Sequence, residues 1–238
     1  MRTSPRVSKP KVEKEQLWKT NDQRANKEGY RRNVYWVSGD LYRGEWKANK
    51  RDGLGVHLYN NGNRYEGEWK NDKQEVKGAL LVVDGGKYHP LYKGGWKGGT
   101  FHGAGVLYGE QGEIYDGQFE QGMRSGLGKQ TYWCPTSKAY HNYSGQWAKD
   151  KREGFGTLKK VNGESYEGLF KNDLRDGKAV LYYADGKSKY EGLWKEDQAV
   201  CGAYLKIDGG CLPLLEVEKS QQIADTFIAE AIQLTSNK

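Results

Sequence analysis

Seven short segments of the chain alternate aromatic and polar residues. Each has a tyrosine, a glycine two residues later and a tryptophan or phenylalanine two residues after that, as in Tyr42, Gly44 and Trp46. Because successive side chains of a β-strand point to opposite faces, these three residues share one face and the polar residues between them share the other. The pattern predicts seven strands with one aromatic face and one polar face, beginning near Tyr42, Tyr65, Tyr92, Tyr115, Tyr143, Tyr166 and Tyr190.

A second pattern follows each tyrosine at a fixed distance. Glycines stand eleven and thirteen residues after it in four of the seven copies, as at Gly53 and Gly55. Three copies depart from this spacing: Val76 replaces the first glycine, Ala179 replaces the second, and the last copy has a displaced Gly202. Since glycine weakens a strand unless another group packs close to the backbone, we expect the aromatic ring of a neighbouring strand to lie over the central glycine of each tyrosine motif, as at Gly44.

Turn signals separate the two-strand units. Pairs such as Asn61-Gly62 and Asp185-Gly186 favour the positive φ angles of hairpin turns. Residues Tyr30–Val37 resemble the second strand of an incomplete unit that precedes the first full one. Seven two-strand units and this half unit predict an all-β fold, an elongated single-layer antiparallel β-meander of about 15 strands in which each unit contacts only its neighbours.

The flanks of the repeat array differ from it in composition. Residues 1–16 predict a disordered basic arm, residues 17–208 the repeat sheet, and residues 209–238 a linker followed by a short C-terminal α-helix. The helix is amphipathic, and it is expected either to cap the sheet or to dock on a partner. Its apolar stripe consists of Ile223, Phe227, Ile228, Ala231 and Leu234.

Charge and composition change this picture little. The formal net charge of the 238-residue chain is +7, and much of the excess lies in the basic arm. The chain begins without an apolar leader and contains no apolar run long enough to span a bilayer, which predicts a soluble, intracellular protein. The three cysteines lack the spacing of a metal site and suit a reducing compartment.

The repeated phrase resembles that of a known family. Tyr-x-Gly-x-Trp followed by Gly-x-Gly is similar to the MORN (membrane occupation and recognition nexus) repeat over residues 29–208. The flanking segments, among them Leu17-Trp18-Lys19 and Leu212-Pro213, resemble a small branch of that family associated with cilia, flagella and sperm. The resemblance implies a cytoplasmic, cytoskeletal protein of the cilium or flagellum, with axonemal or ciliary complex subunits, such as those of radial spokes, as partners.

No motif for catalysis is evident. The sequence lacks a phosphate-binding Gly-Lys-Ser/Thr loop and a Gly-x-Ser-x-Gly elbow, and its four histidines lie in different repeats without ligand spacing. We therefore expect no enzymatic activity, no cofactor and no metal. Nucleic acid is not an expected partner, because the aromatic rings that alternate with glycine are needed for packing.

Two binding surfaces follow from the pattern. The favoured hypothesis is a scaffold that binds protein partners through the aromatic face of the middle repeats, because large aromatic side chains are enriched in binding hot spots. The predicted contact residues are Tyr65, Trp69, Tyr92, Trp96, Tyr115, Phe119, Tyr143 and Trp147. The alternative is a membrane-surface adaptor that binds anionic phospholipids through its arm and basic loops. The loop residues in question are Lys149, Lys151, Arg152, Lys171 and Arg175.

Overall fold

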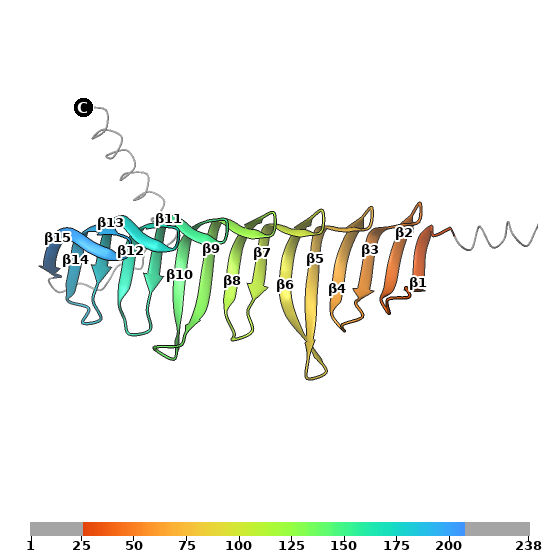
Figure 1. The fold of residues 1–238 in the computed structure, drawn as a ribbon, viewed down its shortest axis with the longest axis horizontal. Coiled ribbons are helices and arrows are strands. Elements are labelled where there is room, and N and C mark those ends of the chain that lie inside the picture. The colour runs from red at the N-terminus through yellow and green to blue at the C-terminus, as the bar shows by residue number, and fades with distance from the viewer. Residues whose placement is uncertain (1–25, 208–238) are drawn as a thin grey trace, which may run out of the picture.

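The computed structural model describes residues 26–207, which form one open antiparallel sheet. Its 15 strands follow one another in sequence order, so that every strand pairs only with its chain neighbours, from β1 at one end to β15 at the other (Figure 1). The predicted all-β meander of about 15 strands is confirmed. The strands are β1 (Gly29–Tyr35), β2 (Leu41–Lys47), β3 (Lys50–Leu58), β4 (Arg64–Lys70), β5 (Lys73–Asp84), β6 (Lys87–Lys97), β7 (Thr100–Tyr108), β8 (Ile114–Glu120), β9 (Met123–Cys134), β10 (Ala139–Ala148), β11 (Lys151–Lys159), β12 (Ser165–Lys171), β13 (Leu174–Tyr182), β14 (Ser188–Lys195) and β15 (Gln198–Lys206).

Two kinds of hairpin alternate along the sheet. The hairpin that follows each motif tryptophan or phenylalanine has a two-residue turn, and both of its residues have positive φ, as at Asn71 (48°) and Asp72 (68°). These are type I′ turns, which match the twist of the strands. Most of the Asn-Gly and Asp-Gly pairs lie at the opposite edge, where only the glycine has positive φ, as at Gly62. Two-residue turns with positive φ at both positions therefore lie mainly at the edge away from these pairs, and the exception is the hairpin after Asp84, where Gly85 and Gly86 form such a turn.

A line of small residues crosses the sheet at right angles to the strands. The motif glycines of the second to fifth units each pair with a glycine on both neighbouring strands, as Gly117 does with Gly105 and Gly128. This glycine line runs from β2 to β15 with a single alanine, Ala179, and it includes the displaced Gly202, which pairs with Gly192. A Cβ atom at Gly117 would lie 2.5 Å from the Cα of Gly128, so the two backbones approach too closely for any side chain.

The sheet is irregular immediately beside the glycine line. Between Gly117 and Phe119 of β8, the register shifts so that β9 contains more residues than the strand opposite it. The same irregularity recurs in the other full units, as between Gly44 and Trp46. Bulges bend a strand and increase its twist. Repeated at the same place in every unit, they give the short hairpins the curl seen along the upper edge in Figure 1.

The core of this single layer lies on the aromatic face. The seven motif tyrosines and their aromatic partners form one chain of edge-to-face contacts from β2 to β14, and six of the tyrosines are at most 2% exposed. Tyr65 lies 5.1 Å from Trp69 of its own unit and 5.1 Å from Trp96 of the next, at interplanar angles near a right angle. Ring pairs in this arrangement are favourable beyond the area they bury. The predicted aromatic and polar faces are therefore confirmed.

The ring that covers a glycine belongs either to the glycine's own strand or to the neighbouring strand. Within a unit, the Tyr115 hydroxyl reaches back over its own strand and donates a hydrogen bond to Gln118 O at 2.9 Å. The same ring covers Gly117 of its own strand and Gly128 of the next. The expectation that a neighbouring strand supplies the ring over the motif glycine is therefore wrong for Gly117, whereas the ring over Gly128 does come from the neighbouring strand. The predicted basic arm and C-terminal helix lie outside the described residues.

Candidate protein-binding face

The eight aromatic residues predicted to bind a partner all lie on the aromatic face, and all are buried within the sheet. The most exposed of them, Trp96 and Trp147, are each 6% exposed, and Tyr65 and Tyr92 are fully buried. Burial raises the pKa of Tyr92 and of Tyr115 to about 12. These rings form the structural core of the face, and partner binding by them stays a prediction. The side chains that cover them are the ones that a partner would meet first.

Most of that cover comes from a row of residues that the sequence analysis missed. We number the two-strand units from 1, which begins at Tyr42, to 7, which begins at Tyr190. In units 1, 4, 5 and 6 an arginine stands nine residues after the motif tyrosine, and it reaches the turn of the following unit. Arg51 illustrates the geometry: its Nε lies 3.1 Å from Asp72 Oδ1, its backbone N donates to the same oxygen, and its Nη2 donates to Asp72 O. The arginines of these four units are Arg51, Arg124, Arg152 and Arg175.

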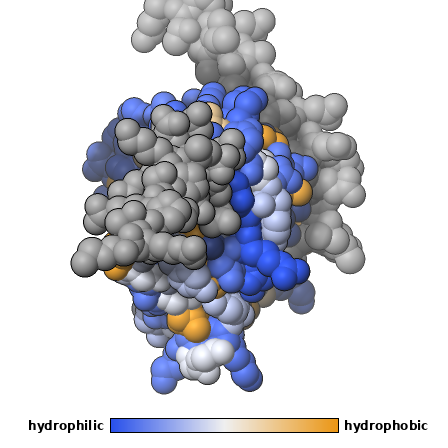
Figure 2. All heavy atoms as spheres, turned by 90° about the vertical axis from the view of Figure 1, so that its right-hand side faces the viewer, coloured by the Kyte–Doolittle hydropathy of each residue, from blue (hydrophilic) through white to orange (hydrophobic). Residues whose placement is uncertain are grey.

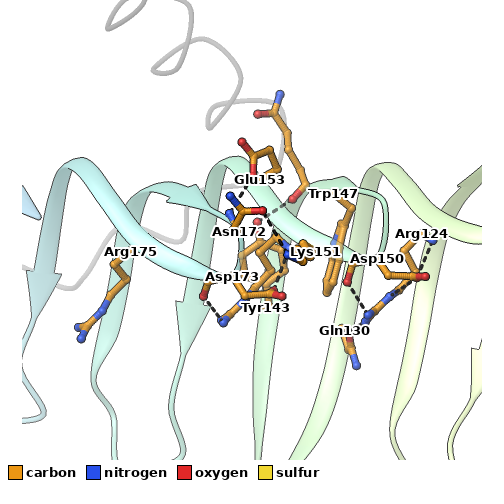
Figure 3. Close-up of polar contacts among 12 residues, drawn as sticks. Arg124, Gln130, Tyr143, Trp147, Asp150, Lys151, Glu153, Asn172, Asp173 and Arg175 are labelled. Carbon is orange, nitrogen blue, oxygen red and sulfur yellow. Dashed lines mark hydrogen bonds and ion pairs between the residues drawn. The ribbon is translucent and has the colours of Figure 1, made fainter. Parts of the chain in front are cut away.

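Each of these arginines also lies over an aromatic ring. The Cζ atom of Arg124 is 4.3 Å from the centroid of Trp147, and that of Arg175 is 4.1 Å from the centroid of Trp194. Figure 3 shows Arg124 between Gln130 and Asp150, beside the ring of Trp147. We call an arginine with its aspartate an Arg–Asp rung, and the whole set of residues at this position the arginine row. The rungs tie adjacent units together while covering the rings.

The signal for the rungs was present in the sequence. The aspartate stands seven residues after the tyrosine of the following unit, as Asp72 does after Tyr65 and Asp150 does after Tyr143. The two residues of a rung therefore belong to consecutive repeats, and a search within single repeats does not find them. A weaker contact replaces the Arg–Asp rung at the β1 end of the sheet. There Lys27 Nζ lies 5.2 Å from the ring centroid of Trp46, and the backbone N of Lys27 donates to Asn49 Oδ1.

Two clefts open on the aromatic face beside the rungs. The larger has a volume of about 790 Å³ and extends from Lys27, past Trp46 and Arg51, to Gln74. The smaller, of about 250 Å³, lies between Tyr132 and the rungs of Arg152 and Arg175. Both have aromatic and charged walls, which suits an amphipathic side chain or peptide segment better than a small apolar molecule.

His57 lies in the larger cleft and is held in its neutral form. Its Nδ1 is 3.0 Å from Arg51 Nη1, a group that can only donate, so the ring proton is on Nε2, 3.8 Å from an Asp40 carboxylate oxygen. Burial and the Arg51 charge lower the pKa of His57, and Asp40 opposes this in part. The cleft therefore carries the charges of Lys27, Arg51, Asp40 and Asp72, without a third cation at neutral pH.

The five residues of the alternative lipid-binding surface do not form one basic patch. Arg152 and Arg175 belong to Arg–Asp rungs on the aromatic face, bound to Asp173 and Asp197. The three lysines, Lys149, Lys151 and Lys171, are exposed at the edge formed by the tight turns, where Lys151 Nζ donates to Asn172 Oδ1. Lipid binding stays a prediction, and of the five loop residues only these three lysines lie outside the Arg–Asp rungs.

Two other features are absent from the described part of the chain. Within residues 26–207, His, Cys, Asp and Glu side chains nowhere gather in a group of three or more that would hold a metal ion. The same residues contain no helix that is long and apolar enough to cross a membrane. Seen from the β1 end, their visible surface is mainly hydrophilic with small, separate hydrophobic patches (Figure 2).

Comparison with known proteins agrees with the repeat pattern. The model of the MORN repeat matches six stretches that together cover more than half of the chain, residues 42–64, 65–87, 92–114, 115–132, 143–165 and 166–188. Curated relatives match over shorter segments. MORN repeat-containing protein 3 of Xenopus laevis is 46% identical over 55 residues, 23% of each chain. The human protein of the same name is 49% identical over 49 residues, 21% of this chain and 20% of its own.

The protein of Macaca fascicularis with that name is 56% identical over 43 residues, 18% of each chain. The aligned segments thus span less than a quarter of the length of these curated relatives. The repeat itself is established over a much longer part of the chain than any one relative covers, and the structure gives every matched copy the same two-strand form. The chain belongs to the MORN-repeat family.

Proposed function

We propose that this chain is a non-enzymatic scaffold that binds protein partners along its aromatic face within the axoneme of a cilium or flagellum, or during axoneme assembly. The observation that carries the binding proposal is the pair of clefts on that face, between Arg–Asp rungs that a continuous aromatic core holds in place. An extended single layer offers a long surface and no enclosed pocket, which favours an elongated partner over a small substrate.

The cellular setting of this proposal rests on relatives. The resemblance of the repeats and their flanks to a ciliary branch of the family supplies the expectation of ciliary, flagellar and radial-spoke-type assemblies. The segments that match MORN repeat-containing protein 3 are short. The expected location is the cytoplasm and cytoskeleton, with axonemal complex subunits as partners. The alternative of a lipid surface has less support, because two of its five residues are bound within rungs.

The test is affinity purification from ciliated cells with variants that change one face at a time. Leu158→Glu places a charge in the smaller cleft, whereas Thr157→Glu places the same charge on the neighbouring residue of β11, which points to the opposite face. Circular dichroism and thermal unfolding select variants that fold. We expect Leu158→Glu to lose axonemal partners that Thr157→Glu retains. Equal recovery by both variants, or no enrichment of axonemal proteins, would contradict the proposal.

A further inference from the structure

An apolar strip crosses the polar face of the sheet in its C-terminal half. Its side chains are those of Leu127, Phe155, Leu169 and Leu193. Each of these residues stands between two residues of the aromatic face, so all four side chains point to the opposite face. In units 1 and 2, glutamate occupies the motif position that Leu169 and Leu193 hold in units 6 and 7. The strip therefore has no counterpart at the β1 end of the sheet.

The strip is packed at its centre and exposed at its two ends. Phe155 pairs with Leu169 and is buried, although it lies outside the aromatic core. Leu169 extends over β13, because a Cβ atom at Gly177 would lie 2.9 Å from its Cδ1. Leu127 and Leu193 are 42% and 43% exposed. Neighbouring strands lie about 4.8 Å apart, so the strip from β9 to β14 is about 24 Å long.

Two hollows open on the same face beside the strip. One, of about 230 Å³, lies between Leu127, Lys129 and Ser144. The other, of about 160 Å³, lies between Ser165 and Tyr182 near the turn that follows β11. Ser165 Oγ is buried there and has no hydrogen-bond partner among residues 26–207. A buried hydroxyl without a partner is costly, so this oxygen indicates that a polar group from elsewhere contacts the second hollow.

The chain leaves the described sheet next to the second hollow. Ile207 N donates to Lys187 O at 2.6 Å, in the turn between β13 and β14. That turn lies at the same edge as the hollow, because Tyr182, the last residue of β13, pairs with Ser165. Residues 208–222 can span up to about 50 Å when extended, twice the length of the strip. The sequence that follows them is therefore within reach of every part of the strip.

The sequence after residue 222 matches the strip in kind and in length. It predicts an amphipathic helix whose apolar stripe extends from Ile223 to Leu234. At about 1.5 Å per residue the stripe is about 16 Å long, close to the separation of about 14 Å between β9 and β12. Phe227 of the stripe provides a large ring for the hollow beside Leu127. A helix this short is marginal by itself in water, so it needs an apolar surface.

The aromatic face of the same units offers a different kind of surface. There Arg124, Arg152 and Arg175 lie over the rings and are paired with aspartates. By contrast, Leu127 and Leu193 present exposed apolar side chains on the polar face. The strip therefore suits an apolar stripe, whereas the aromatic face suits a partner of mixed polarity.

We propose that residues 208–238 fold back over the polar face of the C-terminal half and form a second layer there. The linker passes the second hollow, where one of its backbone groups meets Ser165 Oγ, and the apolar stripe of the helix lies on the apolar strip. This inference goes beyond the proposed function, because it assigns the C-terminal segment to the chain's own polar face and leaves the aromatic face open to partners.

Two leucines of the strip can be changed with little risk to the sheet. Leu169→Gln with Leu193→Gln removes half of the strip and introduces the residue that units 4 and 5 carry at this position. In those units the Oε1 atoms of Gln118 and Gln146 accept a backbone N–H of the next strand. The double variant is therefore expected to keep the sheet while the strip loses apolar surface.

Leu127→Gln has a matched control in Leu54→Gln. Both leucines stand between the two glycines of a unit, and both are exposed on the polar face, but Leu54 lies on β3, away from the strip. Leu158→Glu changes the aromatic face of the same half instead. Thermal unfolding selects the variants that keep the wild-type fold. Hydrogen exchange with mass spectrometry then follows the amides of residues 217–234 in the full chain, with a synthetic peptide of those residues as the unprotected reference.

We expect the amides of residues 217–234 to exchange at least about tenfold more slowly in the wild type than in the peptide, at every chain concentration. Leu127→Gln and the double variant should remove most of this protection, because each takes apolar surface away from the helix. Leu54→Gln and Leu158→Glu should leave the protection unchanged.

Three results would overturn the inference. Peptide-like exchange in the wild type would mean that the segment is free or needs another protein. Protection that is lost in Leu158→Glu and kept in the strip variants would place the segment on the aromatic face. Protection that rises with chain concentration would indicate a second copy as the occupant. Capture of axonemal partners tests the proposed function separately from all three.

Discussion

Trp46 of the first unit and Trp147 of the fifth occupy the same position of the same motif, and they are buried to nearly the same extent. Their indole N–H groups differ. Trp147 Nε1 donates to Gly128 O at 3.3 Å, whereas Trp46 Nε1 is buried without a partner. The residue across from the motif glycine differs too, because Gly145 pairs with Gly128 in the fifth unit and Gly44 pairs with Arg31 in the first.

The last unit supports the same relation. Trp69 and Trp96, whose units have glycine across from the motif glycine, both donate to a glycine carbonyl of the preceding unit. In the last unit Gly192 pairs with Ala179, and Trp194 Nε1 again lacks a partner. Ring burial therefore needs only the tyrosine and tryptophan of adjacent units, while the indole hydrogen bond also needs two glycines to face each other across the strands.

Gly117→Val should have the largest effect on the interior units. A Cβ at Gly117 would lie 2.5 Å from the Tyr115 hydroxyl and from the Gly128 backbone, so the added side chain must displace the core. We expect a loss of about 3 kcal/mol in the free energy of unfolding, the upper part of the range for overpacking. Urea unfolding measures the loss, with Ala104→Val on the exposed opposite face as the control. Matching midpoints for the two variants would contradict the packing described for the glycine line.

Gly128→Ala should make the fifth unit resemble the first and last units, in which the indole N–H of the motif tryptophan has no hydrogen-bond partner. The methyl group would meet the Tyr115 ring, and Trp147 would lose the position from which it reaches Gly128 O. We expect a loss of about 2 kcal/mol, from crowding and one hydrogen bond. Solvent exchange of the Trp147 indole proton, followed by NMR, should approach that of Trp46.

The converse change tests the same relation at the other end. Ala179→Gly should let Trp194 Nε1 reach the carbonyl oxygen of residue 179, which would slow exchange of its indole proton. Its net effect on stability should be near zero, because a hydrogen bond of about 1 kcal/mol offsets a similar entropic cost of glycine in a strand. Unchanged exchange in both variants would show that the facing glycines do not control this bond.

The pH dependence of stability should distinguish the first unit from the interior. The pKa of His57 is lowered in the folded state, mainly by burial and then by Arg51, so protonation favours the unfolded chain. This contribution is complete above the unfolded pKa of about 6.5 and is lost as the pH falls below it. His57→Gln should reduce the loss of melting temperature between pH 7.5 and pH 5.5.

His141 needs a parallel variant, because burial and Lys160 lower its pKa as well. His141→Gln should remove a separate share of the same pH dependence, and the double variant should have the flattest profile. A profile for His57→Gln as steep as that of the wild type would mean that the neutral form of His57 contributes nothing to the stability of the first unit.

Lys27→Arg with Asn49→Asp should have the smallest effect, and it should be stabilising. The changes turn the weak contact at the sheet end into an Arg–Asp rung, with Trp46 as the ring. We expect a gain of about 0.5 kcal/mol, since exposed ion pairs contribute little. Thermal unfolding at low and high salt measures the gain, and Lys47→Arg, outside the arginine row, is the control. A loss of stability would show that the sheet end cannot accept the interior arrangement.

The strands, their faces and their number could be predicted from the sequence, because they depend on local pattern. A period of two places Tyr42, Gly44 and Trp46 on one face whatever surrounds them. The turns were predicted less well. The positive φ of both residues in pairs such as Asn172-Asp173 follows from the hairpin geometry of the sheet, and Val76 keeps a positive φ of 56° where other units have glycine.

The candidate site could not be predicted in the same way. Whether the aromatic rings face solvent or form the core depends on how adjacent units approach, and the glycine line with its bulges brings them close enough to bury the rings. An Arg–Asp rung joins residues 21 or more positions apart, such as Arg51 and Asp72. Its two residues, and their replacements at Gln74 and Phe101, stand at fixed positions of consecutive repeats, but which residues pair follows only from the register between units.

The sequence by itself therefore determined the repeat, the alternation of faces and the all-β class of this protein, because backbone geometry links each of these to a spacing of a few residues. The tertiary structure decided which of the residues on the aromatic face are buried core and which are surface. That division depends on contacts between repeats. Facing glycines let the backbones approach closely, the rings fill the remaining space, and Arg51, Arg124, Arg152 and Arg175 cover rings of the core.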